Sequence, residues 1–218
     1  MIKAVLFDLD GTIINSEEGI TKCVQYALSS FGIEEPDRKK LLCFIGPPLD
    51  PVFREKYGFD ADKAWQAVLK YRERFDKTGI FECELYEGVA DTIRKLKEAG
   101  CVIALASSKP ETACRRILEH FSLTPYFDEI VGSTLDGSIS TKQQVLEELG
   151  RRMEHMQITK DQMCLIGDTE YDVIGADQFG IRCVGVSYGF GKREQLERAG
   201  AYCVCDNMAE VVDALQQM

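Results

Sequence analysis

The chain is poor in the residues and segments on which several protein classes depend. It has only two histidines among 218 residues, and none of its nine cysteines forms a CxxC pair, so zinc and dithiol-exchange sites are not indicated. No apolar run approaches the roughly 18 residues that a membrane span needs. Lysines and arginines, 26 together, are outnumbered by 36 aspartates and glutamates, which gives a net charge of −10. This deficit of positive charge argues against a protein that holds a nucleic acid polymer.

The cysteines and the first residues of the chain bear on its location. The cysteines are odd in number and scattered through apolar stretches, which predicts reduced core residues. Met1-Ile2-Lys3 leads directly into an apolar strand pattern, without the charged leader and cleavage site of an export signal. We therefore expect a cytoplasmic protein with no membrane contact, acting as a monomer or weak homodimer.

From residue 80 onward, helical and strand patterns alternate. Short apolar runs typical of buried strands, such as Cys101–Ala106 and Met163–Ile166, are separated by helical stretches. Ile2–Phe7, at the start of the chain, has the same strand character. This alternation predicts an α/β fold, with a Rossmann-like core in which a parallel sheet carries helices on both faces.

A segment of different character separates the first strand from the alternating part. Apolar residues recur at helical spacing between residues 16 and 79, which predicts an all-helical domain inserted after the first strand. We therefore expect a core domain formed by residues 1–15 and 80–218 and a helical domain formed by residues 16–79. A helical stripe that includes Trp65 and Leu69 is interpreted as part of the core of this helical domain.

Polar residues gather where strands of the predicted parallel sheet end, and α/β proteins bind ligands at that edge. The residues that share this placement are Asp8, Asp10, Ser107, Ser108, Lys109, Lys142, Asp168 and Asp172. Clustered carboxylates repel one another and need a cation, and an oxygen-only set without His or Cys favours Mg²⁺ over Zn²⁺. Protein-bound Mg²⁺ commonly shares its coordination shell with a phosphate, which Lys142 and the Ser107 hydroxyl would also hold. The pattern predicts a site for phosphoryl transfer.

The order of these polar segments along the chain carries further information. They are Asp8-Leu9-Asp10-Gly11-Thr12, Ser107, Lys142 and Gly167-Asp168-Thr169-Glu170-Tyr171-Asp172. This order is that of the four motifs of haloacid dehalogenase-like phosphatases, which the chain resembles over almost its whole length. The helical insertion is similar to the cap domain of the branch that contains phosphoglycolate phosphatase and β-phosphoglucomutase. Phe44-Ile45-Gly46-Pro47-Pro48-Leu49 resembles a segment of the 5′-nucleotidase-like group within that branch.

The resemblance implies a role for each acidic residue. Asp8 would be the nucleophile that forms an aspartyl-phosphate, and Asp10 would be the general acid and base. Asp8, Asp10 and Asp168 would ligate Mg²⁺, with Asp10 contributing its backbone carbonyl. Asp172 would act on the metal through a water or would orient Lys142, which joins Asp8 and Asp10 in catalysis.

The resemblance also bears on the substrate, a small phosphorylated metabolite. Ser107, Ser108, Lys109 and Lys142 are expected to bind its phosphate. Gln143 stands where typical phosphoglycolate phosphatases have a proline after the motif lysine, and this departure disfavours phosphoglycolate. We therefore expect a nucleoside 5′-monophosphate, hydrolysed as by a 5′-nucleotidase.

Several alternatives stay open from the sequence. A phosphoglycolate or sugar-phosphate phosphatase and a β-phosphoglucomutase-like mutase would share this architecture. A 2-haloacid dehalogenase is disfavoured because it does not need the acid and base that Asp10 supplies. A phospho-acceptor signalling module also uses acidic residues, Mg²⁺ and a lysine, but the large helical insertion argues against it. The segment Tyr188-Gly189-Phe190-Gly191 is interpreted as a loop at the rim of the site rather than a phosphate-binding loop.

Overall fold

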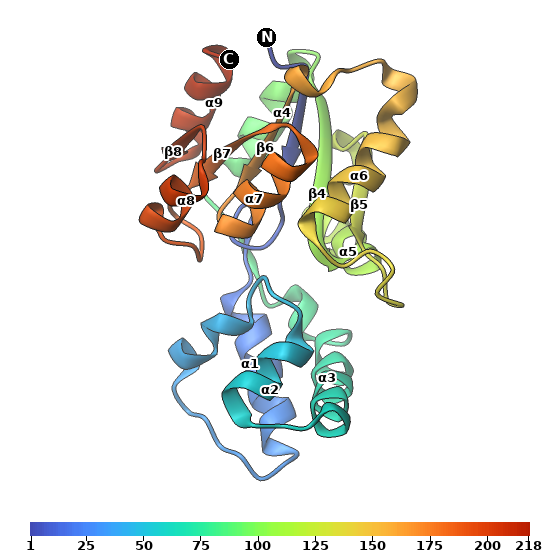
Figure 1. Cartoon of the computed structure of the whole chain (residues 1–218), viewed down its shortest axis with the longest axis vertical. Helices are drawn as coiled ribbons and strands as arrows, with labels where there is room; N and C mark the ends of the chain where they lie inside the picture. The colour runs from blue at the N-terminus through green and yellow to red at the C-terminus, as the bar shows by residue number, and fades with distance from the viewer. The chain divides into compact units, whose positions relative to one another are not determined.

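The computed structural model describes residues 1–218 and divides them into two compact units (Figure 1). One unit consists of Met1–Asn15 and Leu85–Met218, and the other consists of Ser16–Glu84. None of the helices combines the length and the apolarity that crossing a bilayer requires.

A six-stranded sheet forms the centre of the first unit, and all its strand pairs are parallel. In spatial order the strands are β5 (Glu129–Ser133), β4 (Val102–Pro110), β1 (Ala4–Phe7), β6 (Met163–Gly167), β7 (Arg182–Val186) and β8 (Cys203–Cys205). Phe7, the last residue of β1, is in register with Leu105 of β4 and Ile166 of β6. The carboxyl ends of β1 and β6 therefore lie side by side, and β4 runs past them to Pro110. The two remaining short strands, β2 (Ile14–Asn15) and β3 (Glu84–Leu85), pair with each other.

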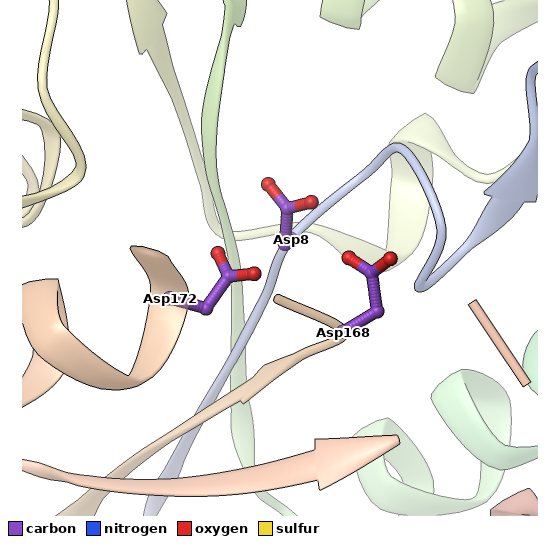
Figure 2. Close-up of side chains that lie close together, drawn as sticks. All are labelled: Asp8, Asp168 and Asp172. Carbon is purple, nitrogen blue, oxygen red and sulfur yellow. The ribbon is translucent and has the colours of Figure 1, made fainter. Parts of the chain in front are cut away.

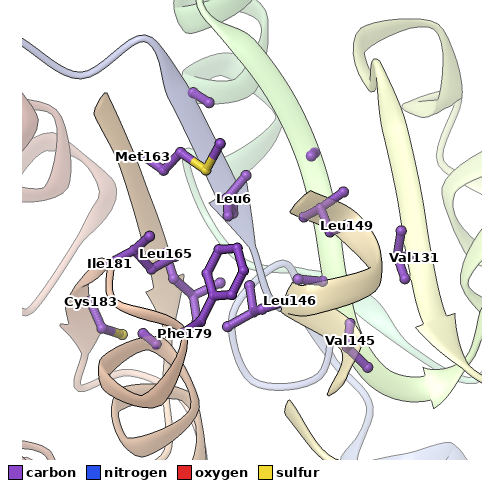
Figure 3. Close-up of a cluster of buried hydrophobic side chains, with 14 of the residues drawn as sticks. Leu6, Val131, Val145, Leu146, Leu149, Met163, Leu165, Phe179, Ile181 and Cys183 are labelled. Atoms are coloured by element: carbon purple, nitrogen blue, oxygen red, sulfur yellow. The ribbon is translucent and has the colours of Figure 1, made fainter. Parts of the chain in front are cut away.

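Helices cover both faces of this sheet, as right-handed crossovers between parallel strands require. One face carries α6 (Lys142–Met153), α7 (Glu170–Phe179) and α8 (Arg193–Ala199), and the other carries α4 (Val89–Glu98), α5 (Glu111–His120) and α9 (Met208–Gln216). Under α6 and α7, Leu6 and Leu165 of the sheet pack in one buried cluster with Leu146 and Phe179 of the helices (Figure 3). The predicted α/β fold with helices on both faces is confirmed.

The second unit is helical. Its elements are α1 (Glu17–Ser29), a 3₁₀ helix at Arg38–Phe44, α2 (Leu49–Tyr57), α3 (Ala61–Phe75) and a 3₁₀ turn at Gly79–Phe81. Aromatic side chains form part of its interior: the rings of Phe44 and Phe53 lie 4.7 Å apart, and Phe53 stacks on Phe59 at 6.0 Å. These pairs supply large buried apolar area within a small unit.

The interpretation of Trp65 and Leu69 as core residues is wrong. Their exposed fractions are 49% and 47%. The buried stripe of α3 is turned away from them and comprises Ala64, Ala67, Val68, Tyr71 and Phe75. The guanidinium of Arg72 lies over the Trp65 ring, 5.7 Å from its centroid. The exposed ring therefore makes a cation–π contact on the helix surface.

The second unit ends later than the sequence boundary at residue 79. The backbone N–H of Gly19 in α1 donates to the carbonyl of Glu82 at 2.9 Å, and Arg74 of α3 holds the Glu82 carboxylate at 2.6 Å. A Cβ on Gly19 would lie 2.1 Å from the carbonyl oxygen of Gly79. These contacts tie the segment after residue 79 to α1 and α3, and the unit closes at Glu84.

Candidate active site

Three buried carboxylates meet at the carboxyl end of the sheet. Asp8 directly follows β1 and Asp168 directly follows β6, the strand beside it, while Asp172 lies in the first turn of α7. One side-chain oxygen of each residue lies within 4.8 Å of the others (Figure 2). The structure thus brings together three of the four aspartates that the sequence analysis assigned to a metal.

Lys142 supplies the positive charge among these carboxylates. Its Nζ lies 2.6 Å from Oδ1 of Asp8, 2.8 Å from Oδ1 of Asp172 and 2.6 Å from the carbonyl oxygen of Ala106. An ammonium has three N–H donors, so all three are committed to these acceptors. A bond from Lys142 to a substrate phosphate would have to replace one of them. Lys142 thus contacts Asp8 and Asp172 at the same time.

The local structure around Lys142 explains its position. Thr141 caps α6 through a capping box with Gln144, so that Lys142 is the first residue of the helix. Gly175 of α7 faces its stem: a Cβ there would lie 2.6 Å from Cγ of Lys142. The helix start and the missing side chain together let a long lysine reach the interior of the site.

Asp172 uses both of its oxygens within the protein. Oδ1 contacts Lys142, and Oδ2 accepts hydrogen bonds from the backbone N–H of Thr169 at 3.0 Å and from its hydroxyl at 2.8 Å. This capping box at the start of α7 fixes the carboxylate. Its contact with Lys142 is the geometry that the second expected role, orienting Lys142, would require.

Asp168 differs because one of its oxygens has no partner. Its Oδ2 accepts a hydrogen bond from the backbone N–H of Phe190 at 2.7 Å, whereas Oδ1 is buried and unpaired. A buried carboxylate oxygen without a partner is costly unless a cation binds it. An oxygen-only donor set with such an orphaned atom fits a hard divalent ion such as Mg²⁺.

The electrostatics of the cluster also favour the binding of a cation. Burial raises the pKa of Asp8 to about 6, because the opposing effect of Lys142 is smaller. Burial and the neighbouring Asp172 and Asp8 carboxylates raise the pKa of Asp168 well above its usual range. Burial alone would lower the pKa of Lys142, but Asp172 and Asp8 outweigh it and raise that pKa. When all three carboxyls are ionised, the single ammonium of Lys142 leaves two negative charges, which one divalent cation would balance.

The segment Tyr188–Gly191, predicted from the sequence to be a loop at the rim of the site, packs against Asp168. A Cβ on Gly189 would lie 2.4 Å from Oδ2 of Asp168, and one on Gly191 would lie 2.0 Å from its carbonyl oxygen. The Tyr188 hydroxyl donates to the carbonyl of Thr12 at 2.9 Å, which ties the loop to the turn after β1. The feature of the sequence that could have indicated this contact is the pair Gly189 and Gly191, shortly after the strand that ends at Val186. Glycine is common where the backbone must approach another group closely.

We expect Gly189→Ala to weaken Mg²⁺ binding about 10- to 100-fold, the range seen when a partner of a metal ligand is lost. The φ angle of Gly189 lies outside the left-handed region, so the added methyl acts through its collision with Asp168 and not through backbone strain. Calorimetric titration of the chelator-treated protein with Mg²⁺ measures the affinity directly.

Gly185→Ala is the matched control for this loop variant. Its Cβ would meet Leu196 at 3.1 Å and would not touch Asp168, so the affinity for Mg²⁺ should stay unchanged. Phe190→Ala retains the backbone N–H and should also bind normally. Equal affinities for Gly189→Ala and the unaltered chain would show that the loop does not position Asp168.

The remaining predicted residues lie on β4 and in the turn after β1. Ser107 is buried, and its hydroxyl oxygen accepts the backbone N–H of Lys109 at 3.3 Å. Ser108 is half-buried. Lys109 and Asp10 pair with each other, with Nζ 2.7 Å and 3.0 Å from the two carboxylate oxygens. The Asp10 carboxylate is thus held by its own lysine and is not a member of the buried triad.

The chain matches known proteins along nearly its full length. The family model of haloacid dehalogenase-like hydrolases matches residues 5–186. A 5′-nucleotidase of Pseudomonas aeruginosa is 39% identical over 212 residues, covering 97% of this chain and 95% of that protein. Tyrosine-protein kinase PtkA of Mycobacterium tuberculosis is 30% identical over 213 residues, covering 98% of this chain and 71% of that protein.

The solved structures agree with this assignment. The crystal structure of a predicted phosphatase from Clostridium acetobutylicum superposes with a TM-score of 0.93 and 43% identity, and each chain is covered completely. The fold, the order of the polar segments and these likenesses lead to one conclusion. The chain belongs to the haloacid dehalogenase-like hydrolase family and is a phosphatase of that family.

Proposed function

We propose that this phosphatase is a Mg²⁺-dependent phosphomonoesterase that works through an aspartyl-phosphate on Asp8. The observation that carries the proposal is the position of the Asp8 carboxylate, which is held by Lys142 at 2.6 Å and lies near Asp168, a residue with one unpaired buried oxygen. A nucleophilic carboxylate needs a fixed orientation and compensated charge when it meets an anionic phosphate. Both are available at this residue.

In the proposed first step, Asp8 attacks the phosphorus atom with the oxygen that Lys142 does not hold. The bond between phosphorus and the ester oxygen breaks, and Asp10, which enters this step protonated, donates its proton to the departing alkoxide. In the second step, Asp10 takes a proton from a water molecule, which attacks phosphorus and releases Asp8 and inorganic phosphate. Proton transfer thus returns Asp10 to its starting state after each cycle.

Mg²⁺ bound by Asp8 and Asp168 would neutralise charge on the transferring phosphoryl group. Lys142 offsets the negative charge of Asp8, so that an anionic substrate can approach it. Ser107, in the strand β4 that pairs with β1, is proposed to hold a phosphate oxygen through its hydroxyl, with Ser108 beside it. Asp172 keeps Lys142 in place through the 2.8 Å ion pair.

We propose a nucleoside 5′-monophosphate as the substrate. Support comes from the 39% identical relative, which is named a 5′-nucleotidase, and from Gln143 in place of the proline of typical phosphoglycolate phosphatases. The Mycobacterium relative carries a different name at 30% identity, so the more similar relative is given the greater weight.

A substrate panel tests this proposal. The panel contains nucleoside 5′-monophosphates, phosphoglycolate, hexose phosphates and an aryl phosphate, each assayed for phosphate release with Mg²⁺ and with chelator. We expect the nucleoside 5′-monophosphates to give the highest kcat/KM and chelator to remove turnover of every compound. A higher kcat/KM for phosphoglycolate would overturn the substrate assignment, and full turnover in chelator would overturn the role of the metal.

A further inference from the structure

Lys109, near the end of β4, forms an ion pair with Asp10 in the turn after β1. Both oxygens of the Asp10 carboxylate lie within hydrogen-bond distance of Nζ of Lys109, at 2.7 Å and 3.0 Å. The side chains are well buried, with exposed fractions of 8% for Lys109 and 10% for Asp10. Two contacts to one carboxylate restrict its rotation more than a single contact does. The pair therefore fixes the orientation of Asp10 as well as its charge environment.

The backbone of Lys109 is itself held in place. Its N–H donates to the Ser107 hydroxyl oxygen at 3.3 Å. Its carbonyl oxygen would lie only 2.5 Å from a Cβ on Gly132, so the glycine leaves room for it. At this point the pairing of β4 with β5 shifts register, between Ala106 and Pro110. Such an irregularity redirects a side chain at the end of a strand. Lys109, whose side chain reaches Asp10, lies within this irregular stretch.

The two lysines of the site have different partners. Lys142 contacts Asp8, the proposed nucleophile, whereas Lys109 contacts Asp10, the proposed acid and base. Each acidic residue with a chemical task is thus held by its own buried cation. This division differs from the expectation that Lys109 binds the phosphate of the substrate.

We propose that Lys109 is a positioning residue that holds the Asp10 carboxylate in the orientation needed for proton transfer to the leaving group. This inference rests on the proposed function, in which Asp10 protonates the departing oxygen as its bond to phosphorus breaks. Proton transfer depends steeply on donor position. Removing Lys109 should therefore slow the cleavage of substrates in proportion to their need for that proton.

The test compares two leaving groups with the Lys109→Met variant, whose side chain has similar length and no charge. A nucleoside 5′-monophosphate releases an alkoxide that requires a proton, whereas 4-nitrophenyl phosphate releases a stable phenolate that does not. The measured parameter is kcat/KM, because it covers the steps from substrate binding to the departure of the leaving group. We expect about a 100-fold fall for the nucleotide and a fall of less than about 3-fold for the aryl ester.

A second comparison shows whether Lys109 acts through Asp10. Adding Lys109→Met to an Asp10→Asn variant should leave kcat/KM for the nucleotide within about 2-fold of the value for Asp10→Asn alone, since effects that act through one residue are not additive. Lys109→Arg, which can still pair with a carboxylate, should recover most of the activity. Thermal unfolding of each variant identifies any general loss of folding. Such a loss would lower kcat/KM equally for both substrates, and so would not produce the expected difference between them.

Several outcomes would overturn the inference. An equal fall for both substrates, in a variant that folds normally, would mean that Lys109 binds the phosphate. An unchanged kcat/KM for the nucleotide would mean that Asp10 needs no partner. If the unaltered chain cleaves neither substrate, the proposed function fails instead, and the role of Lys109 falls with it.

Discussion

Asp8→Asn is expected to lower kcat by about 10⁶-fold, the scale of loss when a covalent nucleophile is removed from an enzyme. An amide is nearly the same size as a carboxylate, but it does not attack phosphorus and does not pair with the charge of Lys142. The measurement is phosphate release from the best substrate of the panel, with Mg²⁺ in excess. The substrate should still bind, because the residues on β4 are untouched.

Asp91→Asn is a suitable control for this variant. Asp91 lies in α4, exposed and paired only with the neighbouring Arg94, so the same chemical change there should leave turnover unaltered. Thermal unfolding should show that both variants fold. Turnover by Asp8→Asn within about tenfold of the unaltered chain would remove Asp8 from the chemistry, since tenfold corresponds to only about 1.4 kcal/mol of barrier.

The second large effect concerns Lys142 and the stability of the core unit. In chelator, Lys142→Met leaves Asp8, Asp168 and Asp172 buried without their cation. Removing one partner of a buried ion pair typically costs about 3 to 5 kcal/mol, so the free energy of unfolding should fall by that amount. This corresponds to a fall in Tm of about 10 °C for a chain of this size. Urea unfolding in chelator measures the change, and turnover should also be lost.

Lys97→Met provides the comparison for the stability effect. Lys97 also pairs with an aspartate, Asp128, but both side chains are partly exposed, and such pairs contribute less than about 1 kcal/mol. Added Mg²⁺ should restore part of the stability of Lys142→Met, because a ligand that binds only the folded state stabilises it. A loss no larger than that of Lys97→Met would contradict the account of Lys142 as the cation of the buried triad.

The sheet and the location of the site were predictable from the sequence for a simple physical reason. Short apolar runs ending in carboxylates, such as Ile2–Phe7 before Asp8, mark buried parallel strands, and adjacent parallel strands end at a common edge. Asp8, Asp168 and Asp172 could therefore be grouped although about 160 residues of sequence separate the first from the others. The helix α8 was not predicted, because its seven residues give little periodicity.

The partners of each polar side chain were not predictable in the same way. The sequence places Lys109 and Lys142 at the same edge, but only the register shift in β4 and the capped start of α6 decide which carboxylate each one meets. The same limit applies to the loop around Gly189, whose close approach to Asp168 depends on tertiary packing. On α3, the apolar residues fit two overlapping helical stripes, only one of which contains Trp65. The stripe that packs against α1 and α2 is the one without Trp65, so Trp65 is exposed.

The most direct test of the central claim is to trap the phosphorylated enzyme and locate the modified residue. The protein is mixed with Mg²⁺ and substrate, quenched in acid and reduced with borohydride, which converts an aspartyl-phosphate into homoserine. Peptide mass spectrometry then reports the position. The account predicts homoserine at position 8 and at no other aspartate. Trapping at another residue, or phosphate release with no trapped intermediate at position 8 under conditions of rapid turnover, would contradict it.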